Sequence, residues 1–336
     1  MTYFGDPTQW LPLTFAALMG LSILVYVVLD GFDLGVGILF PFADEAEKDR
    51  MIASIGPFWD ANETWLVLAI GILLVAFPTA HGVILTSLYL PVAIMLIGLI
   101  LRGVAFEFRV KAPAHHKNGW DTAFFTGSLM TALAQGFMLG KYVMGLESTF
   151  GTWIFAAISA VFLAVGYSFI GACWVILKTD GALQQKAVDW AKGGIWGLII
   201  GIASVSLATP WVSPRIFDKW FTFPEFFLLL PLPLMSGILI ALLWYALRHL
   251  PTRNDSWAWF PFAASIVLFT LAFFGMSYSF YPYVVPEQLT IYEAASAPES
   301  LFIVLIGTVF VLPVIAGYTV MAYTIFRGKA TELRYD

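Results

Sequence analysis

Residues 29–42 read LDGFDLGVGILFPF and continue an uncharged apolar run that begins at Leu11. The combined stretch is longer than the roughly 20 helical residues that cross a hydrocarbon layer of about 30 Å. Two acids, Asp30 and Asp33, lie three residues apart within it and therefore share one face of a helix. The stretch predicts a membrane-spanning helix that carries a pair of carboxyl groups.

The composition of the whole chain supports a membrane protein. Of the 336 residues, 60% are hydrophobic and only 12% are charged, and the mean hydropathy is +0.84. An average soluble domain has about 25% charged residues. No basic stripe suggests a nucleic-acid partner. The connections between apolar runs are too short for a large soluble domain, so we expect one integral membrane domain over residues 1–336.

Nine apolar segments are long enough to span the membrane. Each is too long for a membrane β-strand of about 10 residues, so an all-α polytopic protein is expected. The predicted spans are 11–41, 55–78, 83–106, 121–140, 152–178, 189–209, 221–247, 257–281 and 299–326.

The basic residues indicate the direction of the spans. When connections are assigned to alternate sides, 14 of the 17 lysines and arginines fall on one side. Because cytoplasmic loops carry the excess of Lys and Arg, the N-terminus is expected outside and the C-terminus in the cytoplasm.

This direction gathers the acids of the first helices at one membrane face. Asp30 and Asp33 lie toward the cytoplasmic end of the first helix. Asp60 and Glu63, again three residues apart, open the second helix in FWDANETWL. Clustered carboxyl groups inside a membrane can exchange protons along a hydrated chain, so these four acids are candidate members of a proton pathway.

Charged residues near the third and fourth spans are candidate partners for these acids. Arg102 is the expected partner of a buried carboxylate, and Glu107 lies one turn further on. Glu107 and Asp121 both lie close to an aqueous loop, where an interfacial acid or a structural ion pair is the favoured interpretation.

Redox ligands are not expected on this chain. The four histidines, His81, His115, His116 and His249, all fall in connections rather than at mid-membrane depth, where axial haem ligands usually lie. There is no Cys/His cluster, and the single cysteine, Cys173, suits apolar packing. We therefore expect no haem and no metal to be bound by this chain, and any redox centre to belong to a partner.

Three motifs resemble subunit II of the cytochrome bd quinol oxidases. They are DGFDLGVG in the first span, FWDANETWL at the start of the second and LRGVAFEFR at the end of the third. The resemblance is specific over about the first 110 residues and beyond them concerns topology and length. It implies two four-helix bundles, 11–140 and 152–281, and a peripheral ninth helix, 299–326.

The resemblance also implies a function. Such complexes lie in the bacterial cytoplasmic membrane, oxidise quinol and reduce dioxygen to water, with protons taken from the cytoplasm. Subunit I is an obligate partner and holds two b-type haems and one d-type or b-type haem. A structural quinone and small single-helix accessory subunits are further partners that the resemblance allows. Asp60 corresponds to a residue assigned to a proton channel at the subunit boundary.

A proton-coupled secondary transporter is the alternative function. Such a protein would show broken helices in corresponding halves and polar groups at mid-membrane depth. Neither feature is clear in this sequence, and the acids lie at one end only.

Overall fold

The computed structural model describes residues 5–212, 214–252 and 254–330, which form a helical protein with one small β-hairpin. Nine helices in these ranges are long and apolar enough to cross a membrane, which confirms the predicted number. The elements are α1 (Pro7–Leu39), a 3-10 turn (Phe40–Phe42), α2 (Glu45–Ile55), α3 (Trp59–Ala76), α4 (Pro78–Lys111), α5 (Ala114–Val143), α6 (Phe150–Lys178), α7 (Gly181–Val212), α8 (Pro214–Phe221), α9 (Glu225–Leu229), α10 (Pro231–His249), α11 (Trp259–Phe280), β1 (Tyr283–Val285), β2 (Leu289–Thr290) and α12 (Pro298–Ile325).

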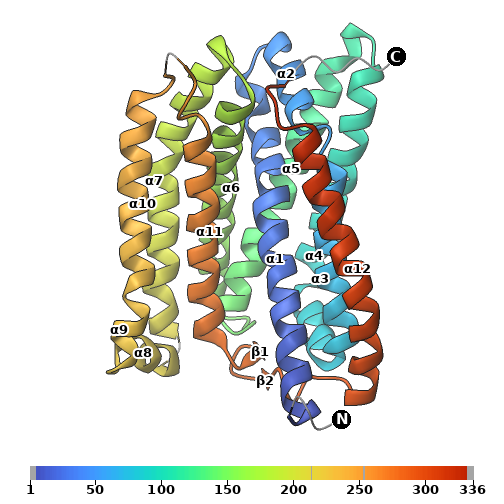
Figure 1. Ribbon diagram of the computed structural model, residues 1–336, viewed down its shortest axis with the longest axis vertical. Coiled ribbons are helices and arrows are strands. Elements are labelled where there is room, and N and C mark those ends of the chain that lie inside the picture. Colours follow the sequence, from blue (N-terminus) through green and yellow to red (C-terminus); the bar gives the residue numbers. More distant parts are fainter. Residues whose placement is uncertain (1–4, 213, 253, 331–336) are drawn as a thin grey trace.

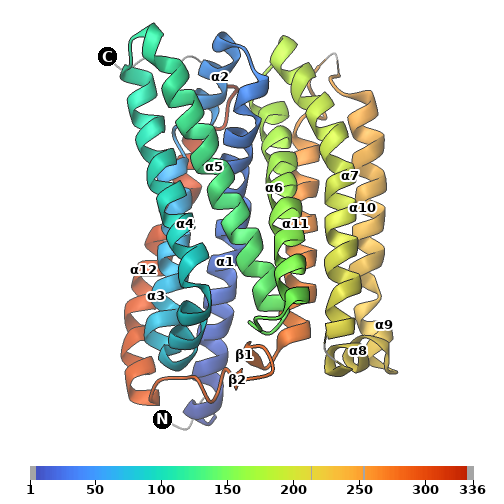
Figure 2. The same cartoon turned by 180° about the vertical axis from the view of Figure 1, so that it is seen from behind.

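The long helices run side by side along the long axis of the molecule (Figure 1). Helices α1, α3, α4 and α5 lie on one side, and α6, α7, α10 and α11 lie on the other, as the view from behind also shows (Figure 2). Helix α12 packs on α1 and α3. In the most apolar stretch of α6, 67% of residues are buried, against 6% in α12. The two groups of helices therefore meet at α6, and the ninth span is peripheral.

The described chain ends lie at opposite ends of the molecule (Figure 1). An odd number of spans requires this arrangement. The short helix α2 lies at the same end as the C-terminus, while the β-hairpin and α8 lie at the other end (Figures 1 and 2).

Local signals in the sequence set several helix starts. Asp6 accepts a hydrogen bond from the backbone N–H of Thr8 at 2.9 Å, and Pro7 begins α1. Asp44 and Glu47 form a reciprocal capping box at the start of α2. These caps satisfy backbone N–H groups that have no partner within the helix.

Helices α1 and α6 approach closely at glycines. A methyl group added at Gly35 would overlap the backbone carbonyl of Tyr167, and one added at Gly171 would lie 2.5 Å from the carbonyl carbon of Gly35. At Gly31 an added methyl would lie 2.7 Å from the Tyr167 ring. The glycine spacing of the first span therefore allows two backbones to touch, as small residues do between membrane helices.

The structure corrects several predicted boundaries. The segment between the first two spans, expected to be a connection, contains α2, because a capping box and ion pairs stabilise a helix there. The third span extends to both sides of the predicted 83–106 because polar turns continue the helix to Lys111. The seventh span starts at Glu225 rather than at the predicted 221, because α8 ends at Phe221 and Pro224 lies directly before α9.

Candidate functional site

Asp30 and Asp33 lie inside the protein, on the part of α1 that packs against α3 and α6. Both side chains are fully buried. They belong to the last third of α1, about three turns and two turns before its end at Leu39. A buried charge is costly without partners, so the surrounding side chains determine what these acids can do.

Arg102 of α4 is the positive charge in this interior. Its guanidinium lies 2.8 Å from Asp30 and also contacts the carboxylate of Glu63 on α3. The Arg102 side chain is 3% exposed, whereas that of Glu63 is 28% exposed. We call Asp30, Asp33, Glu63 and Arg102 the acidic cluster. Two of its carboxyl groups pair with the guanidinium, and the third, Asp33, lies one turn from Asp30 on α1.

Several atoms of the acidic cluster keep free hydrogen-bonding capacity. Within the described residues, neither oxygen of Asp30 accepts a hydrogen bond, so its contact with Arg102 is an ion pair only. One oxygen of Asp33 and the Nε of Arg102 are likewise buried without a hydrogen-bond partner in the protein. A buried carboxylate oxygen in this state can bind water or a proton, and the Arg102 N–H can donate to water.

The second oxygen of Asp33 is held by a chain of hydrogen bonds from two other helices. Asn62 of α3 donates to Asp33 at 2.8 Å, and the Tyr323 hydroxyl of α12 donates to the Asn62 side-chain oxygen at 3.1 Å. Trp65 and Thr319 make a second contact between α3 and α12 at 3.4 Å. The peripheral helix α12 is therefore connected to the acidic cluster.

A second buried chain was not predicted from the sequence. Gln135 of α5 donates to the Tyr26 hydroxyl at 2.6 Å and accepts from the Tyr167 hydroxyl at 2.7 Å. Tyr26 lies one turn before Asp30 on α1 and within its electrostatic range. The available signal was Gln135, the one amide side chain in the predicted span 121–140.

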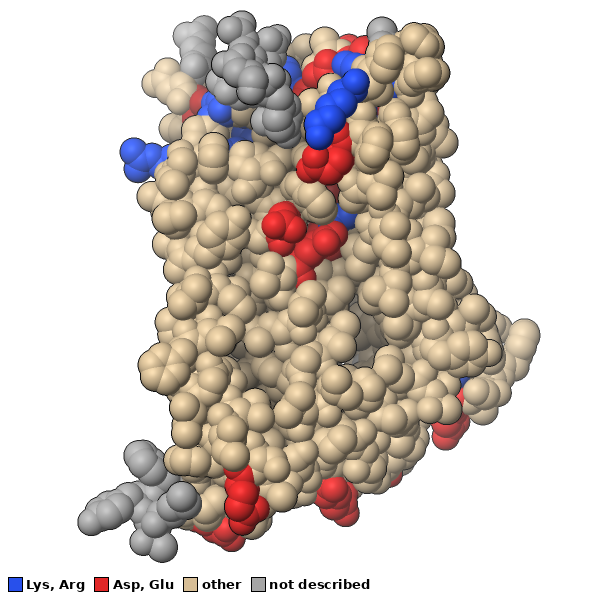
Figure 3. Space-filling model, turned by 90° about the vertical axis from the view of Figure 1, so that its right-hand side faces the viewer, with Lys and Arg blue, Asp and Glu red and all other residues tan. Residues whose placement is uncertain are grey.

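The two acids of α3, Asp60 and Glu63, lie at or near the protein surface. Asp60, in the first turn of α3, is exposed, and Glu63 lies one turn further. On the face where α12, α3 and α4 lie, acidic side chains form a patch below the charged end, with Lys or Arg atoms at its upper edge and uncharged surface below it (Figure 3). Glu63 therefore connects this face to the buried Arg102.

Glu107 and Asp121 lie apart from the acidic cluster. The side chain of Glu107 is 49% exposed and lies 3.9 Å from Lys111 on the same helix. Asp121 is buried and pairs with Arg109 at 2.5 Å and with Lys48 at 2.8 Å. Arg109 also pairs with Asp49 of α2 at 2.5 Å, so these charges fasten α2 to α4 and α5. The Arg109 and Lys117 charges lower the pKa of the Asp49 carboxyl, outweighing the rise that partial burial causes.

The four histidines lie at or near the ends of helices. His115, His116 and His249 are exposed, and His81 is half-buried near the start of α4. Within the described ranges, no group of three or more His, Cys, Asp or Glu residues is placed to hold a metal ion.

Comparisons with known proteins give a consistent result. Residues 11–326 match the family described as cytochrome bd terminal oxidase subunit II. Cytochrome bd ubiquinol oxidase subunit 2 of Bacillus subtilis is 30% identical, over 91% of this chain and 93% of that protein. Cytochrome bd-I ubiquinol oxidase subunit 2 of Escherichia coli is 26% identical, over 94% of both chains.

A solved structure shares the fold. The bd oxidase structure from Geobacillus thermodenitrificans contains a chain that matches with a TM-score of 0.75 at 16% identity. The match covers 96% of this chain and 100% of that chain. The family match, the motifs and the nine apolar helices lead to one assignment. The chain belongs to the cytochrome bd terminal oxidase subunit II family and is a multi-pass protein of the bacterial cytoplasmic membrane.

Proposed function

We propose that this chain supports assembly of a haem-bearing subunit I and supplies it with cytoplasmic protons for the reduction of dioxygen by quinol. Membership of the family supports the general part of this proposal, that the chain is an oxidase subunit. The relatives are subunits of ubiquinol oxidases, so the chain is one subunit of an oxidoreductase complex that has a subunit I and carries haems. Haems supply the electron transfer and oxygen chemistry in such a complex.

The acidic cluster is the observation that carries the proposal. Two carboxyl groups, those of Asp30 and Glu63, pair with one guanidinium, and the buried Asp33 lies one turn from Asp30, in an interior of low dielectric where an uncompensated negative charge is costly. Binding protons lowers that cost, and the Asp30 carboxylate and the Asp33 oxygen that accepts no hydrogen bond are available to receive them. The cluster is therefore suited to hold and pass protons.

Asp60 and Glu63 supply the connection between the cluster and the outside of the chain. Asp60 is exposed on the face of α3, and Glu63 reaches from that face to Arg102. Protons that enter the cluster from the cytoplasmic side would pass from Asp30 and Asp33 through Glu63 to Asp60. A subunit I that covers the exposed face of Asp60 would take them up there.

The orientation is part of the proposal. The end of the molecule with α2 and the C-terminus carries most of the lysines and arginines, which supports a cytoplasmic location. The acidic cluster lies toward that end of α1, so its protons would come from the cytoplasm.

Replacing Asp60 with Asn in the purified two-subunit complex tests the proton route. A positioned proton donor contributes about 10²–10⁴-fold to a rate, so quinol-driven oxygen consumption should fall at least about tenfold. The reduced haem spectrum, recorded on the same sample, should stay at the wild-type intensity. Glu107→Gln is the matched control, because Glu107 is an exposed acid on the neighbouring helix and lies outside the cluster.

Two outcomes would contradict the proposal in different ways. Wild-type oxygen consumption of Asp60→Asn with full haem content would exclude Asp60 from a required proton route. Loss of haem in Asp60→Asn but not in Glu107→Gln would assign Asp60 to assembly of the complex instead.

A proton-coupled transporter is the weaker alternative because the family of the chain is that of oxidase subunits. An absorbance spectrum separates the two functions. Reduced b- and d-type haem bands that copurify with a second, larger subunit support the oxidase. A colourless protein that moves a solute on its own would support the transporter.

A further inference from the structure

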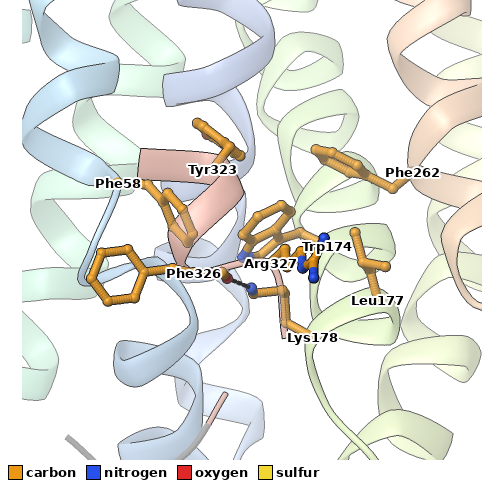
Figure 4. A pocket seen from close by; sticks show the side chains of 8 residues that line it. All are labelled: Phe58, Trp174, Leu177, Lys178, Phe262, Tyr323, Phe326 and Arg327. Carbon is orange, nitrogen blue, oxygen red and sulfur yellow. Dashed lines mark hydrogen bonds between the residues drawn. The ribbon is translucent and has the colours of Figure 1, made fainter. Parts of the chain in front are cut away.

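A small pocket opens at the end of the molecule where most basic residues lie. Its volume is about 190 Å³, and Figure 4 shows how its side chains converge. The walls come from the residue before α3, the ends of α6 and α12 and the start of α11. The lining residues are Phe58, Trp174, Leu177, Lys178, Phe262, Tyr323, Phe326 and Arg327.

The pocket combines aromatic walls with positive charge. Five of its eight lining residues are aromatic and two are cationic, and among the described residues that line it none is acidic. The ammonium of Lys178 lies 5.2 Å from the centre of the Phe58 ring and 5.3 Å from that of Trp174. Arg327 is exposed and lies beside Trp174 and Lys178 in the close view (Figure 4).

Lys178 is a buried cation whose hydrogen bonds are incompletely used. Lys178 as a whole is 4% exposed. The ammonium donates to the backbone carbonyls of Phe326 at 2.5 Å and Gly328 at 2.7 Å. Within the described ranges no carboxylate pairs with it. An ammonium has three donors, so one donor and the full positive charge remain for an anion.

The location favours an amphiphilic anion. The pocket lies between the ends of spanning helices, and apolar side chains at the end of α12 are exposed, with Ile325 at 62% and the following pocket residue Phe326 at 49%. Such surfaces face the lipid, and aromatic residues are enriched at the membrane interface. The volume corresponds to about six water molecules of roughly 30 Å³ each, enough for a phosphate group and its attached glycerol.

We propose that this pocket binds the phosphodiester headgroup of an anionic phospholipid. Lys178 and Arg327 bind the phosphate oxygens, and the aromatic rings pack against the glycerol and the first acyl carbons. Proton supply through the acidic cluster does not require this lipid. The site is independent of the acidic cluster, although Tyr323 belongs to the pocket wall and to the hydrogen-bond chain that reaches Asp33.

The test uses the delipidated two-subunit complex in detergent. It is titrated with dioleoylphosphatidylglycerol or dioleoylphosphatidylcholine in mixed micelles, and bound lipid is counted by native mass spectrometry. We expect saturable binding of phosphatidylglycerol at a stoichiometry of at least one and weaker binding of phosphatidylcholine. Arg327→Gln should weaken phosphatidylglycerol binding about fivefold, the factor that about 1 kcal/mol per cation near anionic lipid gives.

Arg248→Gln is the matched control, because Arg248 is an exposed arginine at the same end, on α10, and stacks on Trp244 at 4.6 Å. It should leave phosphatidylglycerol binding unchanged. Lys178→Gln is less suitable, since this residue also fixes the end of α12. A further arm adds inorganic phosphate, which should not displace the lipid at equal concentration.

Three results would overturn the proposal. Equal binding of the two lipids would show that charge is not recognised. Equal losses in Arg327→Gln and Arg248→Gln would indicate a general surface effect. Displacement by inorganic phosphate at equal concentration would assign the pocket to a soluble anion.

Discussion

Arg102 is the residue of the acidic cluster whose replacement should destabilise the interior of the molecule most. It lies between Asp30 and Glu63 and is almost completely buried. A buried ion pair need not add net stability, because both partners lose water on burial. Removing one partner is much worse, because the other charge then stays buried without compensation. Arg102 and Asp30 should therefore behave as a pair.

Arg102→Gln is predicted to reduce the amount of assembled complex in the membrane. Breaking a buried pair costs about 3–5 kcal/mol, which is comparable with the total stability of many domains. Adding Asp30→Asn should restore part of the yield, because the uncompensated charge is then removed. The measurement is the haem-containing complex recovered per milligram of membrane protein. A double variant that is no more abundant than Arg102→Gln alone would show that the Asp30 charge is not what Arg102 compensates.

At the scale of elements, contact between α1 and α6 joins the two groups of helices. The contact occurs where Gly35 and Gly171 face each other with their backbones touching. Membrane helices gain stability from such close packing, since lipid provides no hydrophobic force between them. Asp30 and Asp33 lie on α1 beside this contact, so its geometry also positions the acidic cluster.

Gly35→Ala is predicted to destabilise the complex, because the added methyl overlaps a backbone carbonyl that no side-chain rotation can move. Overpacking of this kind costs typically about 1–3 kcal/mol. Gly237→Ala on α10 is the control, since its added methyl has no neighbour within 4 Å. Thermal unfolding in detergent should show a lower midpoint for Gly35→Ala and an unchanged or higher midpoint for Gly237→Ala. Equal midpoints of Gly35→Ala and the wild type would contradict the close contact.

The sequence predicts the membrane spans well and the short elements between them poorly. The spans were predictable because a membrane requires long apolar runs, and all nine lie where such runs occur. Helix α2 was missed although the sequence shows its capping-box residues, Asp44 and Glu47. The ion pairs that also stabilise it join it to other helices and leave no local pattern. The β-hairpin was missed because its strands have only three and two residues.

The candidate site was predictable only in part. The motifs place four acids and Arg102 near one membrane face, but depth along a helix does not say which side chains meet. Asn62 and Tyr323 are 261 residues apart, and Gln135 and Tyr26 are 109 apart, so no local spacing could pair them. The only local sign was a polar side chain within an apolar run.

At the scale of the whole molecule, the positions of the basic residues predict which end faces the cytoplasm. The two ends of α5 allow a direct test, because Asn118 near its start and Glu147 just beyond its end are both exposed. The single natural cysteine, Cys173, is buried and should give little background.

We predict that Glu147→Cys reacts with a membrane-impermeant maleimide in intact spheroplasts, whereas Asn118→Cys reacts only after the membrane is opened. The reason is the excess of lysine and arginine at the end of the molecule that includes Asn118. Labelling is read by mass shift of the chain. The reverse pattern would invert the orientation and place the acidic cluster toward the outer compartment.

The contacts of α12 impose an order on how the protein can be completed. Translation runs from the N-terminus, so Asp33, Asn62 and Lys178 enter the membrane long before Tyr323 and the carbonyls of Phe326 and Gly328 exist. Until the ninth span is inserted, Asn62 lacks its tyrosine donor and the Lys178 ammonium lacks both backbone acceptors. Helix α12, which is synthesised after the other eight spans, thus completes polar contacts begun by earlier ones, and a nascent chain that stalls before it leaves them unfinished.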